Sequence, residues 1–195
     1  MRLRVLAAAA AVCFLLAPSA QAAGSFEEEV LAAINYARTK PQAFARHLRD
    51  ADPEYASWAG DEPGALDEAV AFLMRQPPLP PLRWDERLGT AARDHADAQG
   101  WRGQEGHTGP RGDTFAQRLQ RVGLYAGLSA ESISYGQMSP EDVVRQLIVD
   151  SRVRNRGHRR DIFSRGFQAA GVGCADHARY GAMCVIQYAG AIVAR

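Results

Sequence analysis

The order of helical and strand-like segments along the chain constrains its fold more than any other feature. Helical spacing of apolar residues, or a helix-capping signal, marks six segments: Phe26–Lys40, Gln42–Leu48, Ala65–Arg75, Asp85–Gln99, Asp113–Val122 and a helix that begins after Ser139. Strand-like segments come late: Ser129–Tyr135, Phe167–Cys174 and Met183–Ala189. The last two predict a hairpin that closes near Tyr180-Gly181. This order predicts the α+β class, with a small antiparallel sheet flanked by helices.

The first 22 residues have the pattern of a secretory signal peptide. Arg2 and Arg4 form a charged start, an apolar run follows from Val5 to Ala17, and Ala20-Gln21-Ala22 is typical of a cleavage site. The apolar run is too short to cross a membrane, and no second transmembrane candidate follows it. We therefore predict a secreted protein, extracellular or periplasmic, whose residues 23–195 form one domain.

The charge balance excludes a general attraction to nucleic acid. The chain has 23 Lys and Arg against 22 Asp and Glu, so loss of Arg2 and Arg4 leaves 21 against 22, a formal charge of −1. Arginines nevertheless concentrate between Arg152 and Arg165. Such a stretch is either a solvated face with local ion pairs or a surface that binds anionic lipid headgroups or wall polymers.

Two of the three cysteines remain after the signal is removed. Cys13 lies inside the apolar run, which leaves Cys174 and Cys184. In an exported chain an even pair favours a disulfide over a metal site. Their separation is suited to a bond across the predicted hairpin, which leaves neither cysteine as a nucleophile.

Three short blocks carry the residues best suited to chemistry: Gly106–Gly109, Ala130–Gly136 and Arg156–Phe163. They contribute His107, Glu131 and His158, two imidazoles and a carboxylate that a single cleft could collect. Glycine beside His107 permits close approach of a ligand, although an exposed loop histidine has the same pattern. Glu131 lies in an otherwise apolar strand, where a buried carboxylate needs an ion pair or a metal, unless the register turns it to solvent.

These residues allow more than one kind of site. Two neutral imidazoles with a carboxylate or water suit zinc, which makes His107 and His158 candidate metal ligands. Alternatively, the histidines hydrogen-bond to Glu131 and the backbone and hold the sheet to a helix. Asp150 ends the helix before His158. It is either a second acid in the cleft or a cap for the turn through Ser151-Arg152.

At these three blocks the chain resembles the CAP superfamily, also described as SCP or PR-1-like domains, and in particular its secreted bacterial branch. Leu82-Arg83-Trp84-Asp85 and Gln187-Tyr188 support the resemblance, which extends over most of the predicted domain. It implies an α-β-α sandwich with a three-stranded antiparallel sheet between helical layers. It also implies a wide cleft with two histidines and two acids. His107, Glu131 and His158 match three of these positions, and Asp150 is the acid nearest to the fourth.

Three functions follow as hypotheses. The first is a secreted, non-catalytic binding protein whose cleft holds a divalent metal such as zinc or a small ligand such as a lipid or sterol, as the resemblance implies. The second is a metal-assisted hydrolase or peptidase, with His107 and His158 on the ion and Glu131 as the catalytic base. The third is an adhesion module that uses the Arg152–Arg165 stretch.

Overall fold

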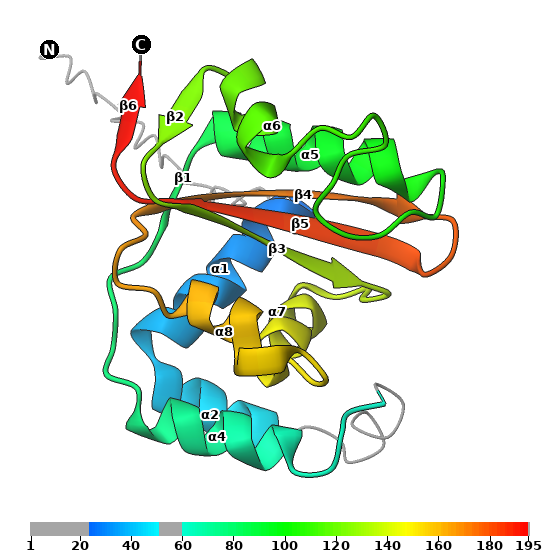
Figure 1. Cartoon of the computed structure of the whole chain (residues 1–195). Coiled ribbons are helices and arrows are strands. Elements are labelled where there is room, and N and C mark those ends of the chain that lie inside the picture. Colours follow the sequence, from blue (N-terminus) through cyan, green and yellow to red (C-terminus); the bar gives the residue numbers. More distant parts are fainter. Residues whose placement is uncertain (1–23, 51–59, 195) are drawn as a thin grey trace, which may run out of the picture.

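The computed structural model describes residues 24–50 and 60–194 (Figure 1). The predicted signal peptide and the first part of the predicted loop after Asp50 lie outside these ranges. Within them, no helix is long and apolar enough to span a membrane.

The strands confirm the α+β class and add one short strand to the expected sheet. The sheet has the order β1-β4-β5-β3, with bounds β1 Arg83–Trp84, β3 Ser129–Tyr135, β4 Ala169–His177 and β5 Gly181–Ala189. β3, β4 and β5 are antiparallel, as predicted, whereas β1 runs parallel to β4. The addition arises because Arg83 and Asp85 donate their N–H groups to the Gln168 and Ala170 carbonyls at the open edge of β4.

A second, two-stranded sheet lies beside the first at one end of the molecule. It pairs β2 (Leu124–Ala126) with β6 (Ile192–Ala194) in antiparallel fashion. β6 continues the chain beyond β5, and β2 precedes β3, so the small sheet extends the same end of the fold (Figure 1).

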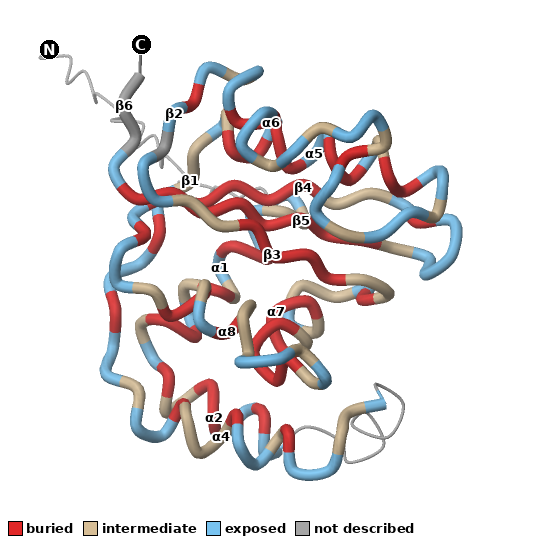
Figure 2. Tube along the Cα trace, viewed as in Figure 1, coloured by how far each residue is buried: buried red, intermediate tan, exposed pale blue. Residues whose placement is uncertain are grey.

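Helices from both halves of the chain lie on one side of the main sheet (Figure 1). They are α1 Phe26–Thr39, α2 Pro41–Asp50, α4 Ala65–Arg75, α7 Pro140–Val149, the 3₁₀ turn η1 Arg154–Arg156 and α8 Gly157–Ile162, with α2 and α4 in the outer layer. α1 begins with the expected capping box of Ser25 and Glu28, and the Ser139 hydroxyl caps α7 by accepting from the Asp142 amide. The largest apolar cluster fills the space between these helices and the sheet, and their inward sides are buried (Figure 2).

The opposite face of the sheet carries α5 (Glu86–Gly100) and α6 (Phe115–Arg121). α5 begins where the Asp85 carboxylate accepts from the amides of Arg87 and Leu88. Gly171 and Gly173 of β4 let α5 lie very close to the sheet, since a Cβ at either position would overlap the α5 backbone. The result is the expected layering of helices, sheet and helices (Figure 1).

Cys174 and Cys184 are joined by a disulfide, as predicted. They are direct partners in the β4–β5 register, so the bond staples the hairpin across its two strands.

Candidate functional site

Both candidate histidines are held through the same ring nitrogen by a carboxylate. His107 Nδ1–H donates to Glu131 Oε1 at 3.0 Å, and His158 Nδ1–H donates to Asp150 Oδ1 at 2.8 Å. Within the described ranges, the Nε2 atom of neither ring has a hydrogen-bond partner. The His107 side chain is 56% exposed and that of His158 is 22% exposed. Each imidazole is therefore fixed in orientation with Nε2 left for another group.

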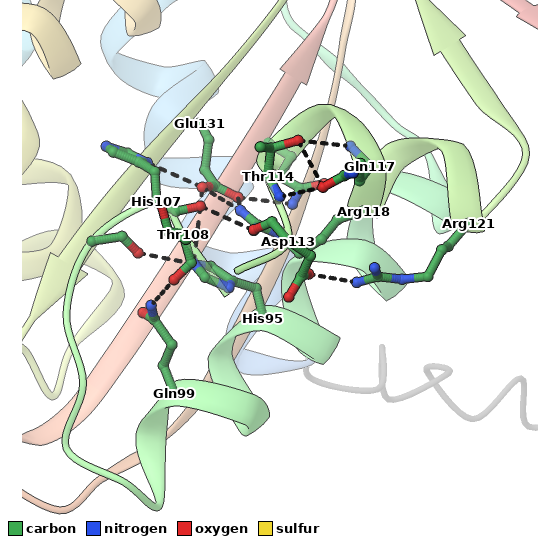
Figure 3. A network of polar contacts seen from close by, with 12 residues as sticks. His95, Gln99, His107, Thr108, Asp113, Thr114, Gln117, Arg118, Arg121 and Glu131 are labelled. Atoms are coloured by element: carbon green, nitrogen blue, oxygen red, sulfur yellow. Dashed lines mark hydrogen bonds and ion pairs between the residues drawn. The ribbon is translucent and has the colours of Figure 1, made fainter. Parts of the chain in front are cut away.

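Glu131 is buried at the centre of a polar network that links three elements (Figure 3). Arg118 of α6 donates from Nη2 to both carboxylate oxygens, at 2.7 and 2.8 Å. Gln187, opposite Glu131 in the β3–β5 register, donates to Oε2 at 3.0 Å. Arg118 Nη1 also donates to the His107 carbonyl at 3.0 Å, which fixes the histidine loop itself. Glu131 therefore faces the interior, in an ion pair with Arg118.

This environment keeps Glu131 ionised. Burial raises the pKa of its carboxyl, but the hydrogen bonds from His107 and Arg118 and the charge of Arg118 outweigh burial and hold the pKa below its usual range. Because both oxygens already accept hydrogen bonds, Glu131 is suited to orienting His107 and poorly suited to removing a proton from a ligand.

Two α5 side chains and one on β3 anchor the His107 loop, and the sequence did not single them out for this role. His95 Nε2–H donates to the Gly106 carbonyl at 3.0 Å, and Gln99 donates to the Thr108 carbonyl at 2.8 Å. The Gly106 amide donates to the Tyr135 hydroxyl at 2.8 Å. The spacing of His95 and Gln99, one helical turn apart beside alanines, was the available signal.

His95 is buried and neutral. Its Nε2 lies 4.0 Å from Glu131 Oε1, yet burial lowers the pKa of the imidazole by more than the nearby carboxylate raises it. A carbonyl is the partner of Nε2, so this nitrogen carries the proton.

Asp150 is a helix cap, with a different partner from the one that the sequence suggested, and it also holds His158. Its Oδ2 accepts from the backbone amides of His158, at 2.9 Å, and Arg159, at 3.3 Å, so it caps the start of α8. The alternative of a cap through Ser151-Arg152 is not observed, because the Asp150 backbone is left-handed and its Oδ2 accepts from α8. Its other oxygen holds His158.

The segment between Asp150 and His158 has an unusual backbone. Asp150, Arg152, Asn155 and Arg156 have φ values of 54°, 61°, 64° and 49°, although none is glycine. Glu62 holds this segment, because its carboxylate accepts from the Arg152 amide and from Arg156 Nη1. Left-handed residues other than glycine carry a conformational cost and often mark functional segments.

The basic stretch is partly neutralised within the fold. Arg156 pairs with Glu62 and Glu68, and Arg159 pairs with Glu68 while donating to two carbonyls at the end of α7. Arg159 is buried. Local ion pairing is therefore observed for Arg156 and Arg159.

Neither histidine belongs to a cluster of three potential metal ligands among the described residues. A cavity of about 350 Å³ is lined by His158 and Asp150 together with Ile133 and Tyr135 of β3, whereas His107 and Glu131 are not among its lining residues. In the part of the chain that the structure describes, no group of three His, Cys, Asp or Glu is placed to hold an ion. Both carboxylates are occupied by the hydrogen bonds given above.

Comparison with known proteins adds a family assignment. The family model described as Cysteine-rich secretory protein family, CAP, matches residues 31–188. An extracellular SCP-domain protein from Bacillus anthracis is similar in structure, with 22% identity and a TM-score of 0.47, over 67% of this chain and 41% of that protein. An outer surface protein from Borrelia burgdorferi is 15% identical with a TM-score of 0.46, over 72% of this chain and 95% of that protein. No curated protein sequence matches the chain.

Proposed function

The chain belongs to the Cysteine-rich secretory protein (CAP) family, and we propose that it is a secreted binding protein without catalytic activity. The observation that carries this proposal is the matched presentation of His107 and His158. Each ring is fixed through Nδ1 by a buried carboxylate and offers Nε2 to a ligand. The signal-peptide pattern of the first 22 residues and the disulfide support function outside the cytoplasm.

The same geometry argues against a hydrolase that uses Glu131 as its base. A general base must reach the proton that it removes and must have a free lone pair directed at it. Glu131 directs its oxygens at His107, Arg118 and Gln187, and its pKa is lowered. Asp150 is likewise saturated by His158 and the start of α8.

A tightly held catalytic zinc fits these residues poorly. A carboxylate behind each imidazole is a common arrangement at metal sites. However, catalytic zinc sites use three protein ligands, and the described residues supply no third donor beside the two histidines. We therefore expect the free Nε2 atoms to hydrogen-bond a small polar ligand or the headgroup of a lipid or sterol.

The first test compares the mature protein with the double variant His107→Ala/His158→Ala and with His47→Ala. His47 is an exposed histidine of α2 beside Glu141 and serves as the matched control. After dialysis against zinc, elemental analysis should find no stoichiometric metal in any of the three proteins. In a screen with bacterial lipid extract and cholesterol, the wild type and His47→Ala should bind and the double variant should not.

Two results would contradict this proposal. Stoichiometric zinc that is lost only in the double variant would establish a metal centre. Binding that survives unchanged in the double variant would remove the histidines from the ligand site.

A further inference from the structure

The outer edge of β3 is an open edge of the main sheet, next to the cavity that His158 lines. β3 lies at the end of the strand order and pairs with β5 along all of its 7 residues, so its other edge has no neighbouring strand in the described structure. An open edge presents N–H and C=O groups that can template another strand, and proteins usually block such edges.

One position of this edge is blocked by a side chain. Tyr135 donates its N–H to Gln146 Oε1 at 3.1 Å, and its carbonyl accepts from Gln146 Nε2 at 3.0 Å. The amide of Gln146 thus takes the place of a peptide group from a neighbouring strand. It also establishes that the backbone groups of Tyr135 point away from β5.

The same direction holds for Ile133 and Glu131. In an antiparallel pair, alternate residues direct both backbone groups to the same edge. Gly136 confirms the alternation, because its N–H donates to the Ala182 carbonyl on the β5 side at 2.8 Å. The N–H and C=O groups of Ile133 and Glu131 therefore face the outer edge, and no described residue hydrogen-bonds to them.

A cavity lies against this edge. Its volume is about 350 Å³, within the range of ligand sites, and Ile133 and Tyr135 form one side. His158 and Val153 contribute to the other side, next to the left-handed residues of the 150–156 segment. The open backbone groups of Ile133 thus face a bounded space beside His158, and those of Glu131 continue the same edge next to it.

We propose that the edge of β3 at Glu131–Ile133 binds an extended peptide segment, which adds to the sheet as a further strand and passes beside His158. Donors and acceptors that repeat every second residue, about 7 Å apart, are complementary to an extended backbone. A lipid chain has no groups to satisfy them. The inference rests on the proposed function, because the added strand passes beside His158, one of the two histidines that present Nε2.

The test uses a substitution that removes one edge donor without removing a bond to β5. Ile133→Pro eliminates the outward N–H, and proline is tolerated on an edge strand at such a position. Ile133→Ala is its matched control, because it shortens the same buried side chain and keeps the N–H. The probe is an array of random eight-residue peptides, together with a copy of the strongest binder that is N-methylated at alternate residues.

We expect the wild type and Ile133→Ala to bind the selected peptide, whereas Ile133→Pro and the N-methylated peptide lose affinity by about tenfold or more. Hydrogen exchange at the Ile133 amide of the wild-type protein should slow when the peptide is added. This last measurement needs no variant, so it remains decisive if Ile133→Pro does not fold.

The proposal is overturned if no peptide of the array binds, if Ile133→Pro or the N-methylated peptide binds as well as its parent, or if exchange at Ile133 is unchanged. A wild-type dimer that Ile133→Pro converts to monomer would show a second copy of the chain as the occupant instead. Histidine-dependent binding of lipid without any peptide binding would overturn this inference alone. Peptide binding that is equally strong in the wild type and in His107→Ala/His158→Ala would overturn the proposed function alone.

Discussion

The two histidine sites reach the same orientation of an imidazole by different physical means. Glu131, which holds His107, is an ionised side chain within a sheet, and its charge is compensated by the buried guanidinium of Arg118. Asp150, which holds His158, lies between two helices and is stabilised by backbone amides at the start of α8. Loss of one member of a buried ion pair lowers the free energy of unfolding strongly, because the other charge stays buried without a partner. Loss of a helix cap lowers it less.

The loops that carry the two histidines also differ, in which residues occupy their left-handed backbone positions. Around His107, Gly103, Gly106 and Gly112 occupy the positions with positive φ. Around His158, the left-handed positions are taken by residues with side chains, and Glu62 and the Arg156 contacts hold them in place. The His107 loop has no strained residue at these positions and is anchored by buried side chains. The 150–156 segment has strained residues and is anchored by the side chain of Glu62.

The largest expected effect is the loss of Arg118. Arg118→Met leaves the Glu131 carboxylate buried without its counter-charge and should reduce the free energy of unfolding by about 3–5 kcal/mol. Urea denaturation of the disulfide-bonded protein measures this change. The double variant Arg118→Met/Glu131→Gln should recover part of the loss, because the remaining amide carries no charge. A cost below about 1 kcal/mol for Arg118→Met would mean that the pair is not the support of this site.

The Glu131 site also shows how far the sequence could lead. A carboxylate within an apolar strand left three states open: an ion pair, a metal site or exposure to solvent. In the structure Glu131 is buried and paired with Arg118. Its partner was not predictable, since Arg118 looks like an ordinary basic residue of a short helix and lies 13 positions away across a turn. Pairing of this kind depends on how α6 packs on the sheet, which local patterns do not specify.

Local signals predicted the elements with caps and periodicity, and missed features that depend on tertiary contacts. The Ser139 cap and the hairpin with its disulfide were visible in the sequence. β1 was not, because two residues have no period, and its pairing depends on where β4 leaves an open edge. The cap that Asp150 forms on α8 was missed since its backbone is left-handed without a glycine to signal it.

A smaller loss of stability is expected at the His158 site when the Asp150 carboxylate is removed. Asp150→Ala removes the cap of α8 and should lower the free energy of unfolding by about 1–2 kcal/mol, again from urea denaturation. Asp150→Asn keeps one acceptor and should cost less. The orientation of His158 should be lost in Asp150→Ala, which is visible as changed ring signals in NMR spectra. If this variant were as unstable as Arg118→Met, the two supports would be equivalent and the contrast between them would be wrong.

Of the two histidine sites, the one around Glu131 should make stability depend on pH, because it contains the buried imidazole of His95. The pKa of this buried imidazole is lowered from its usual 6.5, so the unfolded chain binds a proton at pH values where the folded chain does not. Stability should therefore decrease as pH falls through about 6.5, until the lower folded pKa is reached. Denaturation at pH 7.5 and 5.5 should show a flatter dependence in His95→Gln than in the wild type. An identical slope in both proteins would assign the effect to other groups.

The smallest expected changes in the free energy of unfolding come from one glycine substitution in each loop. The two changes should have opposite signs. Arg152→Gly removes a side chain at a φ of 61° and keeps the amide that Glu62 accepts from, so it should stabilise the protein by about 0.5–1 kcal/mol. Gly106→Ala places a Cβ at a φ of 93° and should destabilise by about 1 kcal/mol or more. Arg154→Gly, at an exposed position without positive φ, is the control and should destabilise slightly, because glycine gains freedom in the unfolded chain. If Arg152→Gly is as destabilising as this control, the 150–156 segment stores no strain at that residue. A stabilising Arg152→Gly would instead place strain at Arg152 itself, in the lining of the cavity beside Ile133 and His158.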